Sequence, residues 1–266
     1  MNILDDIVAS KKTELDGLKA QFPLEQLKER ARSNAKAGRS FRRLFDAGAV
    51  LIAEIKPKSP SEGALIARSP LDNARGGPLD IAALYAKSDA DVISVLTDTK
   101  YFGGSNALLT DVRARVPQLI LRKDFIIEEY QVYETATLGA DVFLLMATIL
   151  DAETLGKLQA LGESLGLEAL VEVHDEKDLE KALAAGAKVI GINNRDLTKM
   201  QTDIATTERL APLVPRAIPF VSESGIHEAS DVMRVRKAGA RGILVGTSIL
   251  RSENPVAKIA ELKKAL

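Results

Sequence analysis

The segment IAEIKPKSPSEG at residues 52–63 places two opposite charges at the end of an apolar run. Side chains of a β-strand alternate between its two faces, so Glu54 and Lys56 point the same way and Ile55 points the other way. The run then breaks into prolines, serines and a second lysine, which is typical of a loop. The segment therefore predicts a carboxylate and an ammonium group aimed at one spot, beside a loop rich in hydroxyl groups.

Three further apolar runs also reach an ionisable residue near their ends. Lys123 follows QLILR, Glu172 interrupts LEALVEV, and Glu223 ends AIPFVSE. One such residue alone could be a surface charge just past a strand, but a set of five argues against this because burying unpaired charge is costly. Carboxylates and ammonium groups in one poorly solvated site shift each other's pKa values, which suits general acid–base catalysis near neutral pH. We therefore expect acid–base chemistry on a small anionic substrate.

Two glycine-containing segments indicate which anion this is. SESGI at 222–226 and LVGTSI at 244–249 each place glycine and hydroxyl residues just before an expected helix. Backbone N–H groups approach an anion closely where side chains are absent, and helix N-termini attract phosphate. Together the two segments predict a phosphate site.

A weak internal repeat shows which elements position these residues. Three similar segments, LGADVFLL, AGAKVIGI and AGARGILV, and a weaker one, SDADVISV, recur about every fifty residues, which fits two βα units per repeat. The glycine in the second position of the first three suits the left-handed residue that ends a helix. The segments begin at Leu138, Ala185, Ala238 and Ser88.

Apolar runs between these segments complete a set of eight strands separated by amphipathic stretches. Asp151 and Asp175 are the expected N-caps of two intervening helices. Eight alternating units predict a single (β/α)8 (TIM) barrel rather than an open doubly wound sheet, the alternative, with the site at the C-terminal strand ends. Residues 1–266 then form one domain, of which 1–48 are a helical N-terminal extension. The expected strands are 50–56, 91–97, 118–124, 141–147, 167–173, 188–193, 217–223 and 241–246.

Composition limits the class of protein. A chain of 266 residues, 46% of them hydrophobic, can bury a sizeable core. Its 36 Lys and Arg residues balance 37 Asp and Glu residues, so the net charge of −1 gives no reason to expect nucleic acid or a membrane as partner. There is no cysteine and there are two histidines, so we expect no metal site and no disulfide. The N-terminal MNILDDIVASKKTELDGLK lacks an apolar signal core, which predicts a cytoplasmic protein.

The motifs together resemble the indole-3-glycerol-phosphate synthase family, (β/α)8 lyases of tryptophan biosynthesis. The resemblance covers nearly the whole chain, and its segments are IAEIKPKSPSEG, VISVLTDTKYFGGS, LRKDFI, LVEVH, IGINNRDL, VSESGI and ILVGTSILR. It implies a substrate of 1-(2-carboxyphenylamino)-1-deoxyribulose 5-phosphate. Ring closure, loss of CO2 and dehydration would give indole-3-glycerol phosphate, with no cofactor.

The resemblance also implies roles for individual residues. Lys123 matches the general acid of ring closure, Glu172 its partner in the dehydration, and Lys56 the lysine that meets the substrate carboxylate. The remaining polar residues around the reacting atoms would be Glu54, Asn193 and Glu223.

Substrate-binding residues follow in the same way. Ser59 would lie near the carboxylate, Ser224 would line the site, and Arg195 would brace the loop that bears Asn193. His174 and His227 match no catalytic position and are expected at strand–helix junctions. The phosphate would contact Gly225, Gly246 and Thr247, and the aromatic ring would pack on Phe102, Phe125, Leu144 and Leu197.

Two alternatives remain open from the sequence. A phosphoribosyl isomerase of similar fold would use a Cys–Asp pair, and the chain has no cysteine. A catalytically altered or silent phosphate-binding barrel would keep the framework without this chemistry. We expect a monomer whose partner is a phosphorylated small molecule.

Overall fold

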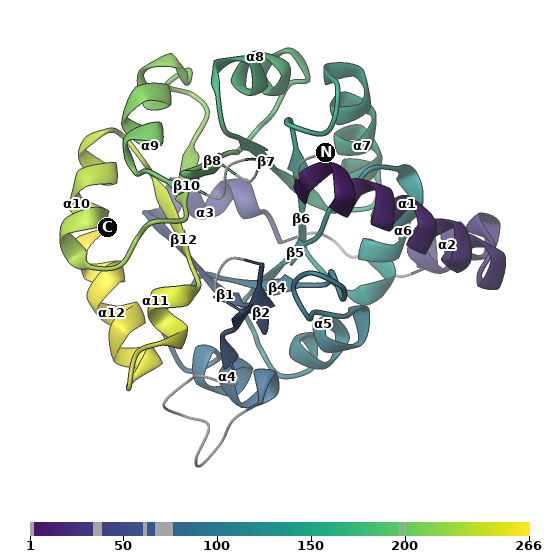
Figure 1. The fold of residues 1–266 in the computed structure, drawn as a ribbon, viewed down its shortest axis with the longest axis horizontal. Helices are drawn as coiled ribbons and strands as arrows, with labels where there is room; N and C mark the ends of the chain where they lie inside the picture. Colours follow the sequence, from purple (N-terminus) through teal and green to yellow (C-terminus); the bar gives the residue numbers. More distant parts are fainter. Residues whose placement is uncertain (1–2, 34–38, 61–62, 67–76, 197, 199–200) are drawn as a thin grey trace.

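The barrel strands are joined edge to edge into a closed ring. The structure, a computed structural model, describes residues 3–33, 39–60, 63–66, 77–196, 198 and 201–266. In this part of the chain, eight parallel strands follow the order β1-β12-β11-β8-β7-β6-β5-β4, and helices surround them (Figure 1). They are β1 (Val50–Ile55), β4 (Val92–Leu96), β5 (Leu119–Lys123), β6 (Val142–Met146), β7 (Glu168–Val173), β8 (Ile190–Asn193), β11 (Phe220–Glu223) and β12 (Gly242–Val245).

These strands confirm the predicted (β/α)8 barrel. The open-sheet alternative is wrong, because β1 pairs with β12 on one edge and with β4 on the other. The expected strand at 217–223 begins only at Phe220. The helices between and after the strands are α4 (Pro78–Tyr85), α5 (Asn106–Arg113), α6 (Glu129–Leu138), α7 (Ala152–Ser164), α8 (Glu176–Ala184), α9 (Ala205–Leu210), η3 (Ala211–Leu213), α10 (Ala229–Lys237), α11 (Thr247–Leu250) and α12 (Pro255–Ala265).

The predicted helix caps are also confirmed. The Asp151 carboxylate accepts from the Thr154 backbone N–H at 2.7 Å, and that of Asp175 accepts from the Asp178 N–H at 2.8 Å. The repeat glycines adopt left-handed backbone angles, with φ of 83° at Gly139, 74° at Gly186 and 109° at Gly239.

Each strand is buried on both faces, as parallel strands covered by helices must be. On β1, Ile52 belongs to the cluster inside the barrel, whereas Leu51 and Ala53 belong to the shell between strands and helices. The next residue on the same inner face is Glu54, near the C-terminal end of β1. The same change from an aliphatic to a charged inward residue occurs from Leu121 to Lys123, Leu170 to Glu172 and Val221 to Glu223.

The predicted N-terminal extension consists of three helices, α1 (Ile3–Gln21), α2 (Leu24–Ser33) and α3 (Phe41–Ala47). In Figure 1, α1 crosses the near end of the barrel and α3 lies at its far end. Leu4 and Ile7 of α1, and Phe41 and Phe45 of α3, belong to the same inner cluster as the inward strand residues. The extension therefore reaches both ends of the barrel. The sequence did not predict α3.

Two short antiparallel hairpins project from the C-terminal end. One pairs β2 (Lys58–Ser59) with β3 (Gly63–Ala64), and the other pairs β9 (Arg195–Asp196) with β10 (Gln201–Thr202). In the described ranges, no helix has both the length and the apolar character needed to span a bilayer.

Candidate active site

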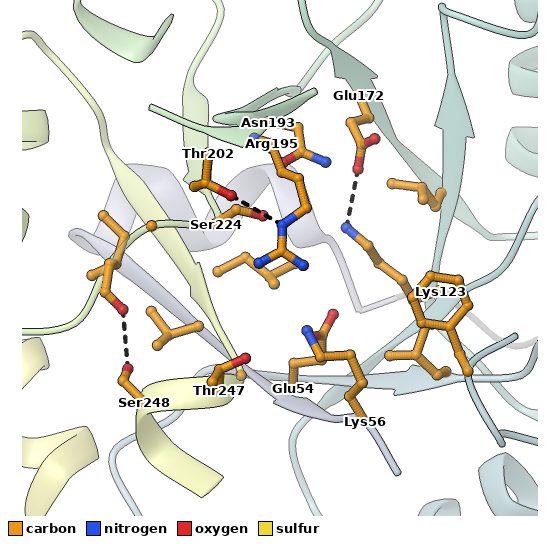
Figure 2. A pocket seen from close by; sticks show the side chains of 18 of the residues that line it. Glu54, Lys56, Lys123, Glu172, Asn193, Arg195, Thr202, Ser224, Thr247 and Ser248 are labelled. Carbon is orange, nitrogen blue, oxygen red and sulfur yellow. Dashed lines mark hydrogen bonds and ion pairs between the residues drawn. The ribbon is translucent and has the colours of Figure 1, made fainter. Parts of the chain in front are cut away.

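A cavity of about 240 Å3 opens at the C-terminal ends of the barrel strands. It lies where a (β/α)8 barrel builds its site from strand ends and the loops that follow. Thirteen of the sixteen predicted site residues line it, and Figure 2 shows many of them pointing inward from different strands. They are Glu54, Lys56, Phe102, Lys123, Phe125, Leu144, Glu172, Asn193, Arg195, Ser224, Gly225, Gly246 and Thr247.

Glu54 and Lys56 share one face of β1 and its extension, as strand alternation predicted. The Lys56 Nζ lies 2.9 Å from Oε2 of Glu54, whose side chain is almost fully buried. Gly246 leaves the space for this carboxylate, since a methyl group built on it would lie 2.6 Å from Oε2 of Glu54. Burial would raise the pKa of Glu54, but Lys56, Lys123 and Arg195 outweigh it and lower that pKa. Glu54 is therefore ionised at neutral pH.

Lys123 lies between two carboxylates that come from different strands. Its Nζ is 3.1 Å from Oε2 of Glu172 and also bonds to Oε2 of Glu223. Burial would lower the pKa of Lys123, but Glu223, Glu172 and Glu54 raise it above its ordinary value. The ammonium form is thus held in place between the two carboxylates.

Glu223 sits beneath the cavity wall and reaches the site through Lys123. Its side chain is 1% exposed, and its Oε1 has no hydrogen-bond partner among the described residues. Burial raises the pKa of Glu223, Lys123 opposes this, and Glu172 adds to it, giving a pKa of about 7. Its pKa therefore lies near neutral pH, where an acid–base group is most effective.

An apolar wall faces these charges. The rings of Phe102 and Phe125 lie 5.9 Å apart between centroids at a tilt of 38°, and Leu144 lines the same cavity. Such a slot accepts a flat aromatic group. Sequence reasoning missed further apolar lining residues: Leu96, Met146, Ile226, Leu244 and Val245. Alternation along the strands could have found Leu96, Met146 and Leu244, but not Val245, which follows Leu244 directly, or Ile226, which lies beyond the end of β11.

The two glycine-containing loops meet on the opposite side. Ser224 and Gly225 are consecutive left-handed residues, with φ of 66° and 77°. Ser248 donates from Oγ to the Ile226 carbonyl at 3.0 Å and so joins the start of α11 to the loop after β11 (Figure 2). The loops therefore form one wall, in which Ser224, Gly225, Gly246 and Thr247 line the cavity.

Buried Asn194 holds this wall from behind. Its Nδ2 donates to the Ser224 carbonyl at 2.9 Å, and its Oδ1 accepts from Thr207 N and Oγ1. Sequence reasoning singled out its neighbours Asn193 and Arg195 but missed Asn194. Strand alternation was the available signal, because it places Asn194 on the outer face of the barrel.

Asn193 and Arg195 are brought together as expected. Oδ1 of Asn193 accepts from the Arg195 backbone N–H at 3.0 Å, while Nε of Arg195 donates to Thr202 Oγ1 at 3.0 Å. The Arg195 guanidinium points into the cavity and adds a cation to its wall (Figure 2). His174, at the junction after β7 as predicted, contacts the Asn193 carbonyl through Nδ1 at 2.9 Å. His227 lies at the junction before α10 and also lines the cavity.

A buried ionic network supports Lys123 and Phe102 from the outside, and sequence reasoning did not find it. Lys11 of α1 lies 3.0 Å from Oδ1 of Asp124 and 3.4 Å from Oδ2 of Asp98. Asp124 also pairs with the buried Arg122 at 3.2 Å, and Asp98 accepts from the Phe102 backbone N–H at 3.2 Å. One lysine of the extension thus joins the loops that follow β4 and β5.

Besides Glu223, the described residues include one predicted site residue that does not line the cavity. Ser59 is 3% exposed in the β2–β3 hairpin and does not line the cavity. Ser59 is thus buried in a short paired segment, whereas the sequence suggested an open loop. Leu197 lies outside the described residues, as do residues 61–62 and 67–76 after β1.

Comparisons with known proteins identify the family of the chain. The sequence matches the protein-family model for indole-3-glycerol phosphate synthase over residues 4–262. It is 42% identical over 265 residues to the indole-3-glycerol phosphate synthase of Streptomyces griseus, covering 100% of this chain and 96% of that one. It is 43% identical over 274 residues to the one from Roseiflexus sp., covering 98% and 97%.

More distant solved structures share the fold alone. A 3-hexulose-6-phosphate synthase from Salmonella typhimurium has a TM-score of 0.63 at 14% identity, covering 82% of this chain and 98% of that one. A thiamine phosphate pyrophosphorylase from Pyrococcus furiosus has a TM-score of 0.60 at 15% identity, covering 84% and 96%. Because the family model and the full-length relatives agree, the chain belongs to the indole-3-glycerol phosphate synthase family.

Proposed function

We propose that the cavity converts 1-(2-carboxyphenylamino)-1-deoxyribulose 5-phosphate to indole-3-glycerol phosphate by general acid–base catalysis. This is the carboxy-lyase activity of the family, in tryptophan biosynthesis. The observation that carries the mechanism is the position of Lys123, whose Nζ lies between Glu172 and Glu223 and within the cavity.

Ring closure is the first step. The ring carbon that bears the carboxylate attacks the ribulose carbonyl carbon, and Lys123 protonates the carbonyl oxygen as it becomes a hydroxyl group. Lys56, which faces the cavity beside Glu54, meets the substrate carboxylate. The new carbon–carbon bond then allows the carboxylate to leave as CO2, and its bonding electrons restore the ring.

Dehydration completes the indole. The hydroxyl group formed from the carbonyl leaves as water, and a proton is lost from the adjacent carbon. Glu172, 3.1 Å from Lys123, is placed to act with it in this proton transfer. Rearomatisation and loss of CO2 drive the sequence, so we propose that it needs no metal or cofactor. Asn193, Glu54 and Glu223 keep the polar surroundings of the reacting atoms ordered.

The substrate spans the cavity between its two unlike walls. The phosphate is proposed to bind the wall formed by Gly225, Gly246 and Thr247, where two glycines let an anion approach the backbone and α11 begins. The aromatic ring is proposed to lie against Phe102 and Phe125. We further propose that residues 1–266 act as one domain and as a cytoplasmic monomer.

The test is a turnover assay with this substrate, following indole fluorescence without added metal or cofactor. Lys123→Ala and Glu172→Gln are each expected to lower kcat by about 10²- to 10⁴-fold, the usual contribution of a positioned acid or base. The matched controls are Lys157→Ala and Glu153→Gln, an exposed Lys–Glu pair on α7 at 2.5 Å, which should keep wild-type turnover.

Two results would count against the mechanism. Near-wild-type turnover in either site variant would remove that residue from it. A folded wild-type protein that binds the substrate without turning it over would favour the silent phosphate-binding barrel.

A further inference from the structure

Gly191 lies at an inward position of β8, the strand between those that carry Glu172 and Glu223. Its register partners are Glu172 on β7 and Val221 on β11. A side chain at this position would project into the barrel just below Asn193, toward the charged layer of the site. Gly191 was not singled out in the sequence, where IGIN reads as an ordinary buried strand.

The space above Gly191 is filled by the Glu223 carboxylate. A methyl group built on Gly191 would lie 2.0 Å from Oε1 of Glu223, far inside van der Waals contact. Its other near neighbours would be Cδ of Glu223 at 3.2 Å and Cδ1 of Leu170 at 3.4 Å. The serious overlap is therefore with the end of one flexible side chain. The backbone at Gly191 has no left-handed φ, so its conformation does not itself require glycine.

The displaced group would be the one that holds Lys123. Oε2 of Glu223 bonds to Lys123, while Oε1, the atom that the methyl group would meet, has no partner in the described part of the chain. Because no hydrogen bond from the described residues holds Oε1, a side chain at 191 would push the carboxylate away from its position. Lys123 would then keep only its hydrogen bond to Glu172. The same arrangement recurs at Gly246, which leaves space for Glu54.

We propose that Gly191 is a positioning residue, whose missing side chain reserves the space from which Glu223 holds the Lys123 ammonium group between two carboxylates. This inference rests on the proposed function of Lys123 as general acid. Gly191 touches no reacting atom and acts only through Glu223.

Gly191→Ala tests the inference. The variant is expected to fold, because a flexible side chain can yield, and to lose about 10- to 100-fold in kcat, the size of effect that a misplacement of about 1 Å produces. KM should change little, since the phosphate and ring walls lie elsewhere. Gly156→Ala on α7 is the matched control, because its methyl group would meet only the Ala185 carbonyl oxygen at 3.8 Å.

A double variant distinguishes positioning from general damage. Glu223→Asp withdraws the carboxylate by one methylene and is expected to lower kcat on its own. Once withdrawn, the carboxylate no longer overlaps a methyl group at 191, so adding Gly191→Ala should cost little more. Losses that multiply in the double variant would overturn the inference, because independent effects add in free energy.

A crystal structure of Gly191→Ala gives a readout that does not depend on turnover. The contact between Lys123 Nζ and Glu223 should be lost there and kept in Gly156→Ala. If the contact persists in Gly191→Ala, or if it is lost while kcat is unchanged, the inference is wrong. If wild type itself fails to turn over the substrate, the proposed function fails, and the crystal structure still decides whether Gly191 places Glu223.

Discussion

Single inward positions turn the barrel from a packed core into a chemical site. On four strands, an inward aliphatic side chain is followed, two residues closer to the C-terminal end, by an inward charged one. These charged residues are Glu54, Lys123, Glu172 and Glu223. Each charge is nearly buried, so each depends on the others for stabilisation, because an unpaired buried charge is costly. The groups proposed to perform the chemistry are thus the same groups that set one another's pKa values.

Glu223→Gln is expected to flatten the pH dependence of the free energy of unfolding between about pH 4.5 and 7. Because the folded-state pKa of Glu223 is raised to about 7, the folded chain keeps a proton that the unfolded chain releases in this window. The free energy of unfolding of the wild type therefore decreases as pH rises through it, by at most about 1.4 kcal/mol per pH unit from this group. Glutamine removes that contribution.

Urea unfolding at pH 5, 6 and 7 measures this difference. The pKa values of Glu54 and Asp124 are lowered, so their contributions are lost only as the pH falls below about 4 and do not obscure the window. The exposed Glu153→Gln is the control. Parallel pH dependences in the wild type and Glu223→Gln would contradict the raised pKa.

The sequence predicts residues well where the deciding pattern is local. A period of two suffices to place Glu54 and Lys56 on one face. It does not show that Glu172 lines the cavity while Glu223 lies beneath it, because that depends on how neighbouring strands are staggered in the closed barrel and on the space at Gly191. For the same reason the sequence does not show that Ser59, in the β2–β3 hairpin, is buried.

At the scale of elements, α1 is fixed to the barrel mouth by a buried cation. Lys11 is 1% exposed and contacts Asp98 and Asp124, which follow β4 and β5. Burial would lower the pKa of Lys11, but Asp124 and Glu14 raise it, so the charge is retained. The helix therefore contributes an ionic bond to the loops that carry Phe102 and Phe125, in addition to its apolar packing.

Lys11→Met is expected to lower the free energy of unfolding by up to about 3 kcal/mol, because it leaves Asp98 and Asp124 buried without this cation while Arg122 still compensates Asp124. Denaturant unfolding at neutral pH measures the change. Lys12→Met, at the exposed neighbouring position, is the control and should have little effect. Equal stabilities of the two variants would show that the buried ion pairs contribute nothing.

Elements with a repeated pattern were predictable, and elements held by distant contacts were not. The eight strands follow from the fifty-residue rhythm, and the N-caps follow from single aspartates. Helix α3 was not predicted because FRRLFDA is only seven residues long, and its apolar residues find their packing partners at the far end of the barrel. The contact of Lys11 with Asp124 joins residues far apart in sequence, and no local pattern reports it.

On the scale of the whole molecule, the two ends of the barrel are separated in function. Phe41 and Phe45 of α3 fill the far end, with ring centroids 5.3 Å apart, and the cavity opens at the other. The inner cluster between them is aliphatic. Stability can therefore change at one end without a change of chemistry at the other.

Phe45→Ala is expected to lower the free energy of unfolding by about 3–5 kcal/mol, since it opens a cavity among fully buried side chains. Turnover per folded molecule should remain within about twofold of wild type, because no site residue is moved. Thermal unfolding and the indole assay below the transition measure the two quantities. Leu213→Ala, at a side chain that is 52% exposed, is the control, and a matching loss of kcat in Phe45→Ala would show that the two ends are coupled.

The junction of β1 with β12 has a consequence for synthesis on the ribosome. Val50 pairs with Gly242, and this seam passes between Glu54 and Lys56 on one side and Gly246 and Thr247 on the other. The N-terminal part of a nascent chain emerges from the ribosome first. Strand β1 therefore cannot pair with β12 until nearly all of the chain has been synthesised. A nascent chain arrested before residue 242 would carry every proposed acid and base and would still lack a closed active site.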